Sequence, residues 1–132
     1  MTTKLNITIA QLNFTLGDIE GNKEKIIASH QKAKKESSDL VIYSELAICG
    51  YPPEDLVLRP SFVEASINAI REIATMTKNA PAILIGGLWQ ETDKLYNAGF
   101  LLSNGKIKNI TSKYDLPNYG VFDEKRLFTA SP

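Results

Sequence analysis

The chain has 132 residues and a mass of 14.6 kDa, a length that suits a single domain. Lys and Arg number 15, as do Asp and Glu, and this zero net charge argues against a dedicated nucleic-acid binder, which needs a basic surface. The single cysteine excludes an internal disulfide, and no run approaches the ~18 apolar residues of a membrane span. The default expectation is a cytoplasmic globular domain.

The first half of the chain alternates predicted strands and helices. Apolar residues alternate with polar ones over residues 5–10, which is typical of a strand. An amphipathic helix is predicted over residues 22–36, and a continuous apolar run at 40–43 suits a buried strand of a parallel sheet. A second helix is predicted over residues 61–78, because its first four residues, Ser-Phe-Val-Glu, have the spacing of a capping box.

The second half is predicted to be mainly strands. A third buried strand is expected over residues 82–89, and strands at 95–103 and 107–113 flank Asn104-Gly105, a strong two-residue hairpin signal. The resulting β-α-β-α-β-β-β order predicts an α/β fold with a mixed sheet, parallel at first and antiparallel at the end. With helices on one face, the other face is expected to be buried by a second layer.

Glu45 directly follows the buried strand at 40–43. Ligands of open α/β sheets bind beyond the carboxyl ends of the parallel strands, so a carboxylate at this place suits a general base. A solvated carboxylate that caps the next turn would give the same pattern.

Lys113 ends the last predicted strand, and Glu124 lies in a charged segment eleven residues later. An ammonium group at Lys113 would stabilise an anion, and Glu124 would orient a lysine or a substrate amine. Taken alone, each residue has a simpler interpretation as a surface side chain.

Cys49 and His30 are the only residues of their types. Cysteine is often a small buried apolar residue, and His30 falls on the apolar side of the first helix, so both are interpreted as packing residues. The spacing of the remaining carboxylates fits neither a zinc site nor a calcium loop.

Two segments together resemble the nitrilase, or carbon–nitrogen hydrolase, superfamily. They are Ser-Glu-Leu-Ala-Ile-Cys-Gly-Tyr at 44–51 and Lys-Tyr-Asp-Leu-Pro at 113–117. The longer stretches 50–56 and 113–128 are similar to the glutaminase domain of glutamine-dependent NAD synthetases. The resemblance implies an α-β-β-α sandwich, of which residues 1–132 would be an incomplete, N-terminal part.

The resemblance also implies residue roles. Glu45 corresponds to the general base, Lys113 to the lysine that stabilises the tetrahedral intermediate, and Glu124 to an additional carboxylate that helps hold the site. The positions that would contact glutamine are Tyr119, Phe122 and Tyr51. The family's nucleophilic cysteine follows the lysine by several tens of residues, and no cysteine follows Lys113 here. The chain alone is therefore expected not to hydrolyse glutamine.

Further expectations concern cofactors and partners. The resemblance implies glutamine as substrate, no cofactor in this chain, and ATP and Mg in a synthetase domain that is absent from the sequence and that amidates deamido-NAD. A homo-oligomer is expected, with no nucleic acid and no membrane. Two alternatives stay open: an amidase or carbamoyl hydrolase of the same superfamily, and a non-catalytic remnant of a split gene that acts as an assembly module.

Overall fold

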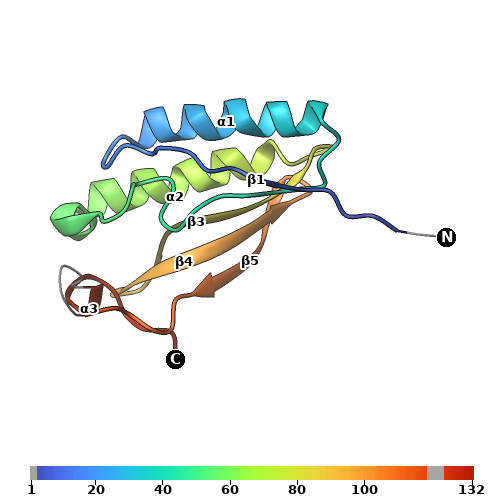
Figure 1. The fold of residues 1–132 in the computed structure, drawn as a ribbon. Helices are drawn as coiled ribbons and strands as arrows, with labels where there is room; N and C mark the ends of the chain where they lie inside the picture. The colour runs from blue at the N-terminus through green and yellow to red at the C-terminus, as the bar shows by residue number, and fades with distance from the viewer. Residues whose placement is uncertain (1–2, 119–123) are drawn as a thin grey trace.

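The computed structural model describes residues 3–118 and 124–132, and Figure 1 shows their arrangement. The α/β class and the predicted order of five strands and two long helices are confirmed, and two short helices are added that periodicity did not predict. The elements are β1 (Ile7–Ile9), α1 (Ile19–Lys35), β2 (Leu40–Ile42), the 3-10 helix η1 (Glu54–Leu58), α2 (Pro60–Thr75), β3 (Ala82–Glu91), β4 (Lys94–Ser103), β5 (Lys106–Ser112) and α3 (Glu124–Leu127).

The strands form one mixed sheet in the order β1-β2-β3-β4-β5. β1, β2 and β3 are parallel neighbours, whereas β3, β4 and β5 are antiparallel neighbours. Two successive reversals restore the direction of the chain, so β5 runs the same way as β2. The residues that follow β2 and β5 therefore emerge toward the same edge of the sheet, which brings Glu45 and Lys113 within reach of each other.

The two long helices lie on one face of the sheet, as Figure 1 shows. Right-handed crossovers that advance in one direction along a sheet place their helices on the same face. The buried side chains between these layers include Ile26 of α1, Ile70 and Ile73 of α2, and Phe100 of β4, each 0% exposed. Burial of each such side chain contributes about 1.5–3 kcal/mol, so this interface carries much of the fold's stability.

The helices begin earlier than the sequence pattern predicts. α1 begins at Ile19 because the Asp18 carboxylate accepts a hydrogen bond from the Gly21 N–H at 3.0 Å. α2 begins at Pro60 and has no side-chain cap, so the predicted capping box at Ser61 is wrong. Proline has no N–H to satisfy, and its fixed φ suits the first helical position. The end of α2 at Thr75 is also earlier than the predicted end at residue 78.

The opposite face of the sheet is apolar and open. Ile7 is 49% exposed, Ile9 is 70% exposed and Leu84 is 38% exposed. Register places Ile9, Ile42 and Leu84 side by side across three strands. No second layer covers this face within the described residues, so the predicted second layer stays a prediction. No helix in the same residues is long and apolar enough to cross a bilayer.

Candidate active site

Glu45 lies in the turn that follows β2, and this turn packs directly onto β3. The backbone of Gly86 bonds to both sides of Glu45: its N–H donates to the Ser44 carbonyl at 3.2 Å, and its carbonyl accepts from the Ala47 N–H at 3.1 Å. A Cβ at Gly86 would lie 2.4 Å from the Leu46 nitrogen and 2.7 Å from the Glu45 Cα. Gly86 is therefore required for the approach that positions Glu45.

The same turn is tied to helix α1 at both of its ends. The fully buried Asn22 side chain donates to the Ile48 carbonyl at 2.9 Å. Tyr43, two residues before Glu45, donates its hydroxyl to the Ile26 carbonyl at 3.1 Å. Burial raises the pKa of the Tyr43 hydroxyl, against a smaller opposing effect of its hydrogen bond to Ser29. Both ends of the turn are thus anchored to helix α1.

Lys113 follows β5 and joins two carboxylates. Its Nζ lies 2.5 Å from Glu45 Oε1 and 3.1 Å from Glu124 Oε1. The three predicted catalytic side chains are thus brought together, although 68 positions separate Glu45 from Lys113. Burial is the largest single influence on the Lys113 pKa and lowers it, but the hydrogen bonds and charges of Glu45 and Glu124 outweigh burial and raise the pKa overall. The lysine is therefore an ammonium ion at neutral pH.

Glu124 is the more buried of the two carboxylates in the cluster. Its side chain is 5% exposed, and its Oε1 accepts hydrogen bonds from Lys113 and from the Tyr51 hydroxyl, the latter at 2.6 Å. Its Oε2 is buried and has no hydrogen-bond partner among the described residues. The predicted glutamine contact at Tyr51 thus lies next to Glu124, whereas Tyr119 and Phe122 lie outside the described residues.

Asn97 is a member of this cluster that sequence reasoning missed. It lies within β4, is 3% exposed, and its Nδ2 donates to Glu45 Oε1 at 2.9 Å. The one available signal was an amide residue in the middle of an otherwise apolar strand, since asparagine is depleted in strands.

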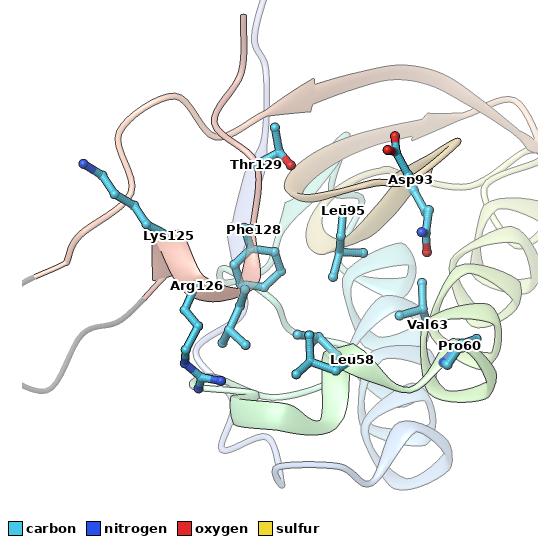
Figure 2. Close-up of a pocket in the computed structure, with 12 residues that line it drawn as sticks. Leu58, Pro60, Val63, Asp93, Leu95, Lys125, Arg126, Phe128 and Thr129 are labelled. Carbon is cyan, nitrogen blue, oxygen red and sulfur yellow. The ribbon is translucent and has the colours of Figure 1, made fainter.

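A hollow of about 380 Å³ opens over this cluster, with Glu45, Asn97 and Lys113 in its wall. Figure 2 shows a different pocket of about 330 Å³, where Leu58, Leu95 and Phe128 converge and Asp93 and Lys125 lie at the edges. The charged groups of that second pocket do not converge on a common point. The hollow over Glu45 is therefore the candidate active-site pocket.

The interpretation of Cys49 and His30 as packing residues is confirmed. Cys49 is 0% exposed, and burial raises the pKa of its thiol to about 12. His30 is 2% exposed and is bonded through Nε2 to the Pro81 carbonyl at 2.9 Å, so it is more deeply buried than expected. Neither side chain is part of the Glu45–Lys113 cluster. In residues 3–118 and 124–132, no three His, Cys, Asp or Glu side chains gather as they would around a metal ion.

Comparisons with known proteins show the family of this chain. The sequence profile of the carbon-nitrogen hydrolase family matches residues 6–132. The chain is 42% identical over 125 residues to a glutamine-dependent NAD(+) synthetase of Thermotoga maritima, covering 95% of this chain and 22% of that protein. It is 45% identical over 124 residues to the glutamine-dependent NAD(+) synthetase of Aquifex aeolicus, covering 94% of this chain and 22% of the relative.

Solved structures show the same fold. A glutamine-dependent NAD(+) synthetase from Cytophaga hutchinsonii superimposes with a TM-score of 0.93 at 32% identity, over 98% of this chain and 22% of that one. An amidase from Nesterenkonia of the nitrilase superfamily superimposes with a TM-score of 0.82 at 21% identity, over 97% of this chain and 48% of that one, and this likeness shows the fold alone.

The chain belongs to the carbon-nitrogen hydrolase family, and its α/β fold is the fold of the solved structures described above. Within that family it is similar to the glutamine-dependent NAD(+) synthetases. The chain spans 22% of the length of the two curated relatives described above.

Proposed function

We propose that this chain contributes the base and the lysine of a site that hydrolyses the side-chain amide of glutamine. The observation that carries the proposal is the contact of Lys113 with both Glu45 and Glu124. Similarity to glutamine-dependent NAD(+) synthetases over almost the whole chain supports glutamine as the amide, rather than the substrate of another amidase.

The arrangement suits a thiol mechanism. Glu45 accepts the proton of a cysteine thiol, and the thiolate attacks the amide carbon of glutamine. The negative charge that develops on the amide oxygen is stabilised by the Lys113 ammonium, and Glu45 passes its proton to the departing nitrogen as ammonia leaves. The resulting γ-glutamyl thioester is then hydrolysed by a water that Glu45 deprotonates.

Glu124 has two roles in this proposal. Its Oε1 lies 3.1 Å from Nζ of Lys113 and helps to hold the ammonium group in place. Its buried Oε2, which has no partner among the described residues, is available to accept a hydrogen bond from the substrate's amino group. Glutamine contacts at Tyr51, Tyr119 and Phe122 remain part of the proposal.

The nucleophilic thiol is proposed to come from outside these 132 residues. Cys49 is the one cysteine in the sequence, and its buried thiol has a pKa of about 12, so it is not a nucleophile at neutral pH. We propose that residues 1–132 are part of a larger glutaminase domain whose remaining layer covers the open face at Ile9 and Leu84. The ammonia would serve ATP-dependent amidation of deamido-NAD in a synthetase domain, within a cytoplasmic homo-oligomer.

Ammonia release from glutamine tests this function. The full-length protein encoded by the gene should release ammonia, Glu45→Ala should abolish release, and Cys49→Ser should retain it. The isolated 132-residue chain should release none. Turnover by the isolated chain that is lost in Glu45→Ala and retained in Cys49→Ser would refute the claim that a thiol outside the chain is needed.

A further inference from the structure

We propose that Asn97 is a positioning residue for Glu45: its amide holds one carboxylate oxygen and leaves the other directed at the reacting proton. This inference rests on the proposed function, because it assigns Asn97 a role that acts through the base. It adds a residue that the predicted Glu45, Lys113 and Glu124 set does not contain.

Asn97 contacts both halves of the carboxylate–lysine pair. Its Nδ2 donates to Glu45 Oε1 at 2.9 Å, and its backbone carbonyl accepts from the Lys113 N–H at 2.8 Å. Cross-strand pairing with Leu88 of β3 fixes the backbone of Asn97 in the sheet. A single rigid strand position thus determines where the carboxylate and the lysine backbone lie.

The side-chain amide of Asn97 would destabilise the fold at this buried position if it made no hydrogen bond. Asn97 is 3% exposed, and its neighbours Tyr96 and Ala98 are 6% and 4% exposed. Burial of an amide without a hydrogen bond is unfavourable, and asparagine is depleted in strands, so an apolar residue would suit the strand better. The hydrogen bond to Glu45 explains why an asparagine, rather than an apolar residue, occupies this position.

The hydrogen bonds to Glu45 fall on one oxygen. Oε1 accepts from both Asn97 and Lys113, and Oε2 receives no hydrogen bond from the described residues. A carboxylate held through one oxygen from two directions cannot rotate freely, so Oε2 is left for proton transfer. An amide suits this task because it donates a hydrogen bond without titrating.

The test compares substitutions of Asn97 in the full-length protein, with ammonia release from glutamine as the assay. Asn97→Leu has nearly the same size and removes the donor, and Asn97→Ser is a smaller alternative if the leucine variant does not fold. Thr77→Val is the control, since it removes a buried hydroxyl that is bonded to the Ala74 carbonyl and to the Gly105 N–H, away from Glu45. Each change is also made in a Glu45→Asp background, where the shortened carboxylate no longer reaches the amide.

The proposal predicts that loss of the amide lowers kcat by about 10- to 1000-fold while KM changes less than about threefold. In the Glu45→Asp background the same substitution should cost about threefold or less in kcat, because its contact is already lost. Thr77→Val should lower the melting temperature and leave kcat within about twofold of the unsubstituted protein, in either background.

Two outcomes would overturn the proposal. One is a kcat within about threefold of the unsubstituted protein in a folded Asn97 variant. The other is an equal loss of kcat in both backgrounds, which is the signature of a purely structural role. Failure of the proposed function is distinguishable, because the unsubstituted protein would then release no ammonia or Glu45→Gln would leave turnover unchanged.

Discussion

Glu45 and Lys113 are joined by a contact of 2.5 Å between Oε1 and Nζ although 68 positions separate them in the chain. The contact exists because β2 and β5 run in the same direction in a sheet that reverses twice between them. The parallel half supplies the carboxylate, and the antiparallel half supplies the ammonium. The position of the site therefore depends on both halves of the sheet. Substitutions of single residues in either half can test this account of the site.

Replacement of Lys113 by Met should lower kcat for glutamine hydrolysis by about 10²- to 10³-fold, the usual effect of removing one group that stabilises an oxyanion. The measurement is ammonia release by the full-length protein. Lys108→Met is the matched control, since Lys108 is an exposed lysine of β5, the strand that precedes Lys113. Unchanged kcat in Lys113→Met would contradict the role given to the ammonium.

Gly86→Ala should lower the free energy of unfolding by about 1–3 kcal/mol, because the new methyl group would meet the backbone of the turn that holds Glu45. Gly99 lies directly opposite Gly86 in the paired strand, and a Cβ there would have nothing within 4 Å. Gly99→Ala should therefore change the free energy by less than about 0.5 kcal/mol. Denaturant unfolding of the two variants checks the difference, and equal losses would show that the approach at Gly86 does not matter.

Ser66→Ala should leave stability unchanged or raise it slightly. The Ser66 hydroxyl is fully buried and has no hydrogen-bond partner among the described residues, so its removal costs nothing that the fold uses. Thr77→Val is the contrasting change and should cost about 1–3 kcal/mol, because the part-buried Gly105 N–H loses its acceptor, the buried Thr77 hydroxyl. Thermal melting of both variants is the measurement, and a large loss in Ser66→Ala would show that the hydroxyl has a stabilising partner.

The Cys49 thiol should resist alkylation by iodoacetamide at pH 8 in the native protein and react after denaturation. Burial raises its pKa to about 12, so almost no thiolate is present at pH 8. The raised pKa of Cys49 also makes the stability of the folded state depend on pH. The folded state holds the proton more tightly than the unfolded state, in which the thiol has its ordinary pKa of 9.0. This contribution to stability is therefore complete below about pH 9 and is lost as pH rises toward 12. Rapid native alkylation would show that the thiol is accessible.

Much of the fold could be predicted because its elements follow simple patterns. The hairpin was predicted from Asn104-Gly105, and both turn residues have positive φ, as a tight hairpin of this kind requires. The start of α2 was missed because a proline at the first helical position replaced a side-chain cap. The helix α3 has four residues, which is too short for any periodic signal.

The candidate site was predicted less completely. Glu45, Lys113 and Glu124 were singled out from their motifs, and their convergence depends on strand order, which local pattern does not specify. Asn97 was missed because its hydrogen-bond partner, Glu45, lies 52 positions away in the chain. Glutamine contacts at Tyr119 and Phe122 remain predictions.

The most direct test of the central claim is covalent labelling of the full-length protein with a diazoketone analogue of glutamine, followed by peptide mapping. The account predicts that the label is found on a cysteine outside residues 1–132, that Cys49 is unlabelled, and that Lys113→Met greatly slows labelling. A label on Cys49, or labelling at an unchanged rate in Lys113→Met, would contradict the account.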